Sequence, residues 1–393
     1  MDIVIVNRLH WPAMKIICAP DSFKESLSAA EAAESMAVGI RSVAMDVDID
    51  LCPIADGGEG TVSALLAATK GQWQQAVVMN PLGEPIDARW GLLGQVRDEP
   101  VTAVIEMAAA SGLELIEASR RDASRTSTYG TGQLISAALA AGASRIILGI
   151  GGSATNDGGC GAAQALGVKF HDHAGRQIMD PMTGAMLLDV SRIDATQLDP
   201  RMAGVQVVVA CDVTNPMTGP DGAAHVYGPQ KGADPQQVEQ LDAGLRHLAV
   251  LFRDQLDQDV EKIAGSGAAG GMGAGLMVLL GGRLQPGVGI VLEAVKFEQR
   301  VAGCDLCLTG EGRIDGQSLS GKACLGVAQV ARNQGVDTIA LVGSVGPQAE
   351  RAREAGLKDF VVIGEGLSVE QSMQRGAELV QRAAERVVGK MIV

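Results

Sequence analysis

A glycine-rich stretch at residues 149–161, GIGGSATNDGGCG, constrains the fold of this chain more than any other segment. The apolar run 145–148 before it has the β-branched composition of a buried strand, and residues 162–166 after it are typical of a helix. Glycines allow tight turns with positive φ, and successive backbone N–H groups at a helix entrance attract anions. The stretch therefore predicts a strand–turn–helix unit of an α/β protein. Its turn is either purely structural or a phosphate cradle.

Asp157 within this stretch indicates what a bound phosphate would need. Its carboxylate would repel a phosphate unless a cation lay between the two groups, so a phosphate cradle here suggests a magnesium–phosphate site. We therefore take the neighbouring residues of the turn as candidate nucleotide or phosphate ligands: Gly151, Gly152, Ser153, Ala154, Thr155 and Asn156.

Composition limits the classes of protein to which the chain can belong. Its 393 residues predict two or three domains, and a hydrophobic content of 47% is enough for a sizeable core. The net charge of -14 argues against nucleic acid or a membrane surface as a partner. Seven cysteines without a signal-peptide pattern indicate a reducing, cytoplasmic location, and no apolar run is long enough to span a membrane. The composition leaves a homo-oligomer open.

The N-terminal region predicts a β–α–β segment that begins near Met14. Residues 15–20 are typical of a strand, whereas residues 1–13 fit poorly with the α/β pattern of the rest of the chain, and we interpret them as an upstream extension. Ser28-Ala29-Ala30-Glu31 is a capping box that predicts a helix to about Val43. A second strand over 47–54 leads into another helix through a turn that carries acids and glycines.

Further along the chain, the patterns alternate between hairpins and βα units. Antiparallel hairpins are predicted around the turn-rich linker 80–85 and at residues 171–176. Helices are expected near 131–141 and 235–255, and strands at 205–210, 305–309, 338–342 and 360–363.

These elements predict two α/β domains. The N-terminal β–α–β segment alone is too small for a good core, so we expect it to join the C-terminal βα repeats in one parallel sheet. The expected fold is a Rossmann-like parallel-sheet domain, residues 1–71 plus 293–393, split by an inserted second α/β domain with antiparallel hairpins, residues 72–292. The substrate cleft is expected between the two domains.

Three motifs match known site patterns incompletely. Residues 265–270 fit G-x-G-x-x-G, but a helical segment rather than a strand precedes them. Residues 316–323 are nearly a P-loop, yet Ala323 replaces the hydroxyl that would bind magnesium. Cys304 and Cys307 have C-x-x-C spacing without a second pair, so we expect them to pack in the core rather than bind a metal. The histidines at 171 and 173 lie in a predicted hairpin, and we expect no metal site there either.

Five strand-end loops share a different chemistry, which combines acids with glycine or hydroxyl donors. They lie at residues 21–24, 56–59, 153–157, 212–215 and 309–315. Any one of them alone could be a helix cap or a turn. Phosphoryl transfer needs backbone donors and cations for the phosphates, carboxylates for magnesium, and a group that orients the attacking hydroxyl. Together the five loops favour that chemistry.

The chain resembles the glycerate kinase family of bacterial glyoxylate and sugar-acid catabolism. The resemblance lies in APDSFKES at 19–26, ADGGEGT at 55–61, the stretch 149–159, ACDVTNP at 210–216, GPQKG at 228–232 and TGEGRID at 309–315. It runs from Met14 nearly to the C-terminus, and residues 1–13 lie outside it. The resemblance implies ATP- and magnesium-dependent phosphorylation of D-glycerate, usually to 2-phosphoglycerate rather than 3-phosphoglycerate. It also implies a Rossmann-like domain interrupted by a second α/β domain.

The roles of individual residues follow from their own chemistry. Asp212 directly follows the strand 205–210, where its carboxylate could deprotonate the glycerate hydroxyl, hold magnesium or merely cap a turn. Asp157 is the rival carboxylate, and Lys24 is expected to neutralise the substrate carboxylate or the transferring phosphoryl group. Gly57 and Gly58 join the candidate phosphate ligands. The expected substrate contacts are Ser22, Arg313, Lys231 and Asn215, and the expected magnesium ligands are Asp56, Glu59, Glu311 and Asp315.

Two other classes of function compete with a kinase. A non-catalytic sensor of a phosphorylated metabolite would favour basic residues over so many carboxylates. A nucleotide-dependent oxidoreductase would rest on the glycine pattern at 265–270, which lacks its strand. The sequence therefore favours a small-molecule kinase.

Overall fold

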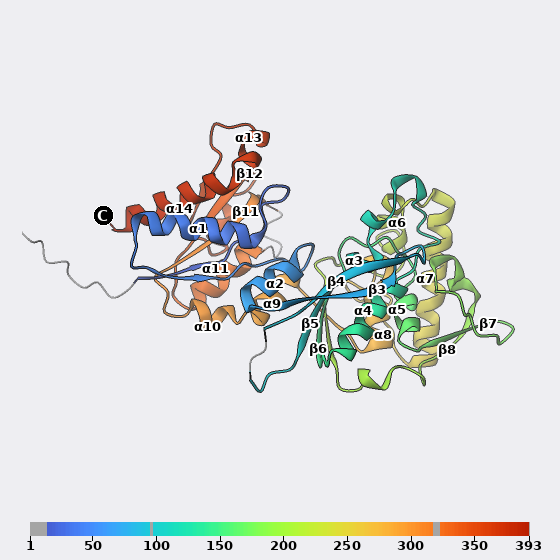
Figure 1. Cartoon of the computed structure of the whole chain (residues 1–393). Helices are drawn as coiled ribbons and strands as arrows, with labels where there is room; N and C mark the ends of the chain where they lie inside the picture. The colour runs from blue at the N-terminus through green and yellow to red at the C-terminus, as the bar shows by residue number, and fades with distance from the viewer. Residues whose placement is uncertain (1–13, 95–96, 317–322, 393) are drawn as a thin grey trace, which may run out of the picture. The chain divides into compact units, whose positions relative to one another are not determined.

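The computed structural model describes residues 14–94, 97–316 and 323–392, which form two compact units (Figure 1). A discontinuous unit comprises the residues up to Ile54 and those from Leu292 onward, and a continuous unit comprises Ala55–Val291. The sequence analysis placed the first division at 71/72 instead. Helix α2 (Thr61–Thr69) lies between these two positions and packs against strands β4 (Pro85–Leu92) and β5 (Thr102–Glu106) of the continuous unit.

The discontinuous unit is built on a five-stranded sheet in which every pairing is parallel. The strand order is β13-β12-β11-β1-β2, so the N-terminal and C-terminal segments do share one parallel sheet, as expected. The strands are β1 (Lys15–Cys18), β2 (Asp48–Leu51), β11 (Leu306–Ile314), β12 (Thr338–Val345) and β13 (Asp359–Val362).

Helices cover both faces of this sheet. Successive side chains of a strand point to opposite faces, and in β12 Leu341 joins one hydrophobic cluster while Ala340 and Val342 join another. The first cluster contains residues of α1 (Ala29–Val43) and α14 (Gly376–Ile392), which lie side by side (Figure 1). The other helices are α10 (Phe297–Val301), α11 (Ala323–Asn333), α12 (Arg351–Glu354) and α13 (Val369–Gln374).

The start of α1 confirms the predicted capping box. Ser28 accepts a hydrogen bond from the Glu31 backbone N–H at 3.3 Å, and the Ser28 N–H donates to the Glu31 carboxylate at 2.9 Å. Farther along α1, a Cβ atom on Gly39 would lie 2.1 Å from the Gln381 carbonyl oxygen of α14. Glycine at this position therefore permits the close approach of the two helices.

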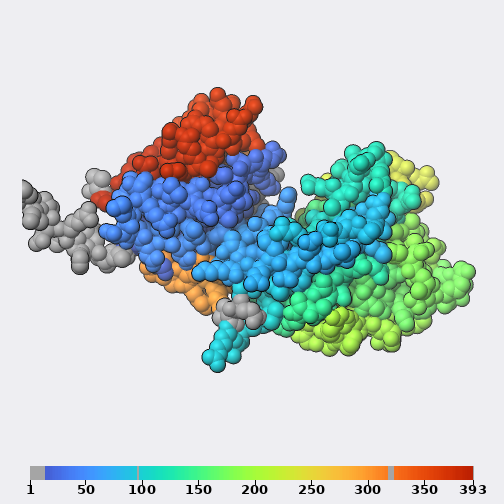
Figure 2. Space-filling view, viewed as in Figure 1, coloured from blue at the N-terminus to red at the C-terminus, as the bar shows by residue number. Residues whose placement is uncertain are grey.

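The continuous unit contains a six-stranded mixed sheet of order β10-β9-β6-β5-β4-β3. Strands β5, β6 (Arg145–Gly149), β9 (Gln206–Ala210) and β10 (Arg283–Gln285) are parallel to one another, whereas β4 pairs antiparallel with β5 and with β3 (Gln72–Met79). The predicted hairpin at the linker 80–85 is confirmed, and its two strands lie at the surface (Figure 2). A small antiparallel sheet pairs β7 (Lys169–Asp172) with β8 (Val190–Asp194).

One hydrophobic core joins the six-stranded sheet to the helices of this unit. The helices that contribute residues to this core are α3 (Ala108–Ser111), α4 (Tyr129–Ala140), α5 (Cys160–Ala165), α6 (Ala223–Tyr227), α7 (Pro235–Leu256) and α8 (Ala268–Leu280). Helix α9 (Gly287–Ala294) begins in the continuous unit and ends in the discontinuous unit. The glycine cluster near 270 forms the start of α8, where Ala269, Gly270 and Gly271 make a left-handed turn with φ of 53, 70 and 84°. Among the described residues no helix is long and apolar enough to cross a membrane.

Candidate active site

A cleft of about 740 Å³ opens at one edge of the six-stranded sheet, wholly within the continuous unit. Because β5, β6 and β9 are parallel, their carboxyl ends meet at this edge, where α/β proteins bind ligands. Three of the predicted strand-end loops line the cleft: those after β6 and β9, and the turn at 56–59 that precedes α2. The lining includes residues 56–59, Glu106, 112–115, 149–153, 210–213, Tyr227, Gln230, Lys231 and 268–269.

Backbone segments pack against one another at the base of the cleft because glycines leave room for them. Gly57 has a φ of +92°, which side-chain-bearing residues rarely adopt. A Cβ atom on Gly287 would lie 1.9 Å from the Asp56 carbonyl oxygen, and one on Gly149 would lie 2.9 Å from the Gly57 oxygen. The 56–58 turn is thus held between the start of α9 and the end of β6.

Two carboxylates in the cleft, Asp56 and Asp212, influence each other. Asp212 accepts a hydrogen bond from the Gly287 N–H at 2.9 Å, and Asp56 accepts one from the Gly58 N–H at 3.1 Å. Partial burial, followed by repulsion from Asp56, raises the pKa of Asp212 above its ordinary value, although the Gly287 N–H opposes the shift. Asp212 is therefore a stronger proton acceptor than an ordinary aspartate.

Glu106 is a cleft residue that the sequence analysis missed. It is the last residue of β5, and its carboxylate accepts the Val62 backbone N–H at 2.9 Å at the start of α2. Burial raises its pKa, while hydrogen bonds from the first residues of α2 oppose the shift. A carboxylate at the end of a parallel strand was the available signal, but the pattern before residue 106 did not define a strand.

Lys231 is the only cation among the described residues that line the cleft. It lies in a 3-10 turn, Pro229–Lys231, and only 2% of the residue is exposed. Its Nζ donates to the Ser153 Oγ at 2.8 Å and to the Thr155 carbonyl oxygen at 2.7 Å. Burial lowers the pKa of Lys231 to about 7, and the charge of Asp157 only partly opposes this shift.

The predicted phosphate turn splits into a part that faces the cleft and a part behind it. Gly151, Gly152 and Ser153 line the cleft, whereas Ala154, Thr155 and Asn156 are buried behind it. The side-chain polar atoms of Thr155 and Asn156 are buried without a hydrogen-bond partner in the described part of the chain.

Asp157 is fully buried and does not belong to the cleft lining. Its carboxylate accepts hydrogen bonds from the Thr128 N–H and Oγ1, both at 2.8 Å, and from the N–H groups of Gly159 and Gly161 at 3.1 and 3.2 Å. Burial nevertheless raises its pKa. These contacts make Asp157 a residue that fixes the start of α5.

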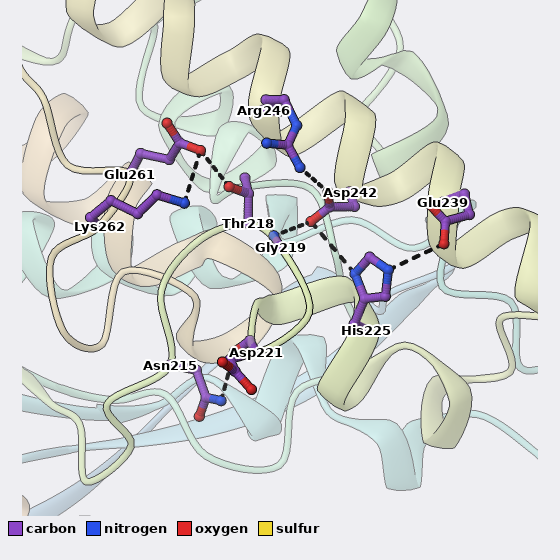
Figure 3. A network of polar contacts seen from close by, with 10 residues as sticks. All are labelled: Asn215, Thr218, Gly219, Asp221, His225, Glu239, Asp242, Arg246, Glu261 and Lys262. Carbon is purple, nitrogen blue, oxygen red and sulfur yellow. Dashed lines mark hydrogen bonds and ion pairs between the residues drawn. The ribbon is translucent and has the colours of Figure 1, made fainter.

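The loop after β9 carries Asp212 and is held by polar contacts from α6 and α7. Figure 3 shows the contact from α7, between Asp242 and Gly219. Asn215 donates to the Asp221 carbonyl oxygen at 2.8 Å and accepts from the Tyr227 hydroxyl at 2.7 Å, which connects the loop to a side chain of the cleft. Asn215 itself does not line the cleft. The Gly219 N–H donates to Asp242 at 2.7 Å, and Asp242 also pairs with Arg246 at 2.6 Å.

The sequence of the continuous and discontinuous units matches one family over almost the whole chain. The profile of the Glycerate kinase family covers residues 16–392. The chain belongs to the glycerate kinase family. The predicted resemblance is thus confirmed, and the chain is an enzyme of the kinase class rather than a sensor or an oxidoreductase.

Several glycerate kinases are similar over nearly their full length. The Bacillus subtilis glycerate kinase is 46% identical, over 96% of this chain and 98% of the relative. The Escherichia coli glycerate 2-kinase is 44% identical, over 97% and 98%. A crystal structure from Salmonella typhimurium LT2, described provisionally as glycerate kinase 2, superposes with a TM-score of 0.88 at 44% identity, over 97% of this chain and 98% of that one.

The remaining predicted site residues of this glycerate kinase belong to the discontinuous unit. Lys24 is exposed, Ser22 is half-buried, and Glu311 is buried in β11. Arg313 donates to Asp315 at 3.1 Å. Residues 317–322 of the near-P-loop and residues 1–13 lie outside the described residues.

The C-x-x-C cysteines and His171, which we interpreted as structural, lie in or next to strands. Cys307 is fully buried in β11, and Cys304, also buried, lies just before it. His171 lies in β7, where its Nε2 contacts the Arg192 guanidinium at 3.0 Å. Within the described ranges, no group of three or more His, Cys, Asp or Glu side chains is placed to hold a metal ion.

Proposed function

We propose that this glycerate kinase transfers the γ-phosphoryl group of ATP to the 2-hydroxyl of D-glycerate, giving 2-phosphoglycerate and ADP. The observation that carries this proposal is the cleft itself, where glycine turns, a raised-pKa carboxylate and one buried lysine meet at the carboxyl ends of three parallel strands. Phosphoryl transfer uses this combination of backbone donors, carboxylates and a cation. The name of the E. coli relative, glycerate 2-kinase, favours the 2-phosphate product.

Asp212 is the residue that we assign to the acceptor hydroxyl. The hydroxyl loses its proton to the Asp212 carboxylate as its oxygen bonds to the γ-phosphorus, and the bond from that phosphorus to the bridging oxygen of ADP breaks. The raised pKa of Asp212 moves it toward the operating pH, which favours general-base catalysis. The Gly287 N–H orients the carboxylate. Gly57, Gly58, Gly151 and Gly152 present backbone to the phosphates.

Magnesium fits the carboxylates of this cleft. Asp56 and Asp212 repel each other, and Glu59 lines the same cleft, so a divalent cation would relieve this repulsion. Magnesium in kinases is held by one or two carboxylates together with substrate phosphates. We assign Asp56 and Glu59 to this role; the bound ion would neutralise phosphate charge. In the discontinuous unit, Lys24 remains predicted to neutralise the substrate carboxylate or the transferring phosphoryl group, and Ser22 and Arg313 remain predicted substrate contacts. Glu311 and Asp315 of the same unit remain predicted magnesium ligands.

Two broader expectations remain part of the proposal. The five-stranded parallel sheet with helices on both faces supports a Rossmann-like domain that the continuous unit interrupts in sequence. The net charge of -14 and the seven cysteines support a cytoplasmic enzyme whose partners are D-glycerate and ATP.

The variant Asp212→Asn tests the assignment of the base. It keeps the shape and the hydrogen bond from Gly287 but removes the charge, so we expect kcat to fall by at least ~100-fold with an unchanged melting temperature. Coupled ADP release measures kcat, and phosphorus NMR of the product distinguishes 2- from 3-phosphoglycerate.

The matched control is Asp221→Asn, on the same loop but outside the cleft lining; it should retain wild-type kcat. If Asp212→Asn stays within a few-fold of wild type, Asp212 is structural. A wild-type protein that releases no ADP with D-glycerate would overturn the proposed function.

A further inference from the structure

Lys231 is a buried amine without a counter-ion. Its Nζ donates to the Ser153 hydroxyl and the Thr155 carbonyl oxygen, both of which are neutral. No carboxylate among the described residues forms an ion pair with it. Asp157, the charge that acts on it, already accepts four hydrogen bonds from Thr128, Gly159 and Gly161. The cost of desolvating an ammonium in this position is therefore only partly offset by these contacts.

We propose that an oxyanion of the substrate is the missing counter-ion of Lys231, so that substrate binding is coupled to the uptake of one proton by this amine. The inference rests on the proposed function, because it takes the ligand of the cleft to be glycerate or the phosphates of ATP. The step is a simple protonation, in which the lone pair of the neutral Nζ accepts a proton from solvent. Lys231 and Ser153 then both face the bound oxyanion from the cleft wall.

The pKa of Lys231 determines the pH range of this coupling. With a pKa of about 7, most of the amine is neutral at pH 8 in the empty cleft. A neighbouring oxyanion stabilises the ammonium form and raises the pKa. At a pH between the pKa of Lys231 in the empty cleft and its pKa in the complex, ligand binding takes up a proton. The affinity therefore falls as the pH rises, by up to about tenfold per pH unit.

The other cleft groups whose pKa is shifted start from ordinary values that lie outside pH 7.5–8.5. Burial raises the pKa of Asp212 and Glu106, but from starting values of 3.8 and 4.5. It also raises the pKa values of Cys211 and Tyr227, from 9.0 and 10.0. The remaining titratable groups of the lining are the carboxyls Asp56, Glu59 and Glu114, and Arg121 flanks Lys231 through its contact with Gly232. The variant Lys231→Met distinguishes proton uptake by this amine from uptake by the carboxyls of the lining.

Calorimetric titration at pH 8 in buffers of different ionisation enthalpy tests the proposal. D-Glycerate alone and a non-hydrolysable ATP analogue with magnesium are titrated separately, so the arm that takes up protons identifies the oxyanion as carboxylate or phosphate. We expect an uptake of roughly 0.5–1 proton per ligand in one arm. The variant Lys231→Met should abolish it, whereas Lys262→Met, whose side chain is 69% exposed outside the cleft, should not.

A second measurement does not depend on a variant that folds. The affinity of the wild-type protein for the same ligand should fall by up to about tenfold per unit from pH 7.5 to 8.5. Binding without proton uptake, or equal uptake in a folded Lys231→Met protein, overturns this inference and leaves the proposed function intact. A protein that binds neither ligand and releases no ADP overturns both.

Discussion

At the level of single residues, Gly287 and Gly289 lie in the same helix, α9, but only one of them has room for a side chain. A Cβ atom on Gly287 would lie 1.9 Å from the Asp56 oxygen and 2.7 Å from the Gly57 Cα, both of which are backbone atoms that cannot rotate away. A Cβ atom on Gly289 would meet nothing within 4 Å. Gly287 also donates its N–H to Asp212. Glycine is therefore required at position 287 because the backbone of the 56–58 turn packs against it, and not because the helix needs a glycine there.

The pair Gly287→Ala and Gly289→Ala tests this distinction. Overpacking should lower the unfolding free energy of Gly287→Ala by about 1–3 kcal/mol. Its kcat should fall by roughly tenfold to 100-fold, because Asp212 and the 56–58 turn shift. Gly289→Ala should gain about 0.5–1 kcal/mol, since alanine favours a helix, and keep its kcat. Urea denaturation measures the unfolding free energy of each variant, and ADP release measures its kcat. Equal values for the two variants would contradict the close packing at Gly287.

At the level of elements, the loop after β9 depends on helix α7 for its position. Asp242 in α7 is buried, with 6% of its side chain exposed, and it accepts the Gly219 N–H of the loop. Its partner Arg246 is half-exposed, so solvent screens much of that ion pair. The hydrogen bond from Gly219 is therefore the contact through which α7 fixes the loop that carries Asp212 and Asn215.

Asp242→Ala should release this loop. A hydrogen bond to a charged group contributes about 1.5–3 kcal/mol, so we expect the unfolding free energy to fall by that amount. Hydrogen exchange in residues 215–221 should also become faster. Glu239→Ala on the same helix is the control, because its side chain is 75% exposed and its loss should stay within about 0.5 kcal/mol. Unchanged exchange in Asp242→Ala would show that other contacts hold the loop.

At the level of the whole molecule, three hydrophobic clusters of the described residues each lie within one unit. The cluster around the six-stranded sheet contains residues of the continuous unit alone, and the clusters around β1, β11 and β12 contain residues of the discontinuous unit alone. Every residue of the described cleft lies between Asp56 and Ala269. The continuous unit therefore carries both its own core and the complete lining of this cleft.

A fragment of residues 55–291 should fold alone. It keeps its core and its sheet in one unbroken stretch of chain, so we expect one cooperative thermal transition and a native near-ultraviolet circular dichroism signal. The fragment lacks β1 and β11, and we expect it to have no kinase activity. A fragment that melts without cooperativity would show that its core depends on the discontinuous unit.

Local patterns predicted much of the fold and the class of the enzyme. The capping box at Ser28 and Glu31 fixes the start of α1 because both partners are within four residues of each other. Strand-end turns also follow from local sequence, since glycines and acids after an apolar run mark the carboxyl end of a strand. By this route Asp56, Ser153 and Asp212 were placed among the candidate residues, and all three line the cleft.

The tertiary structure determined which of these residues line one cleft and how burial and neighbouring charges shift their pKa values. Lys231 and Ser153 are 78 positions apart, and only the packing of their loops brings the amine to the hydroxyl and away from water. Asp157 and Asp212 look alike in sequence, yet the first is enclosed by N–H groups and the second faces the cleft. Burial and the charge of a distant neighbour set a pKa, and neither can be read from the residues on either side. Sequence by itself therefore determined the elements and the family of this protein, whereas long-range packing determined its cleft and the protonation of the groups within it.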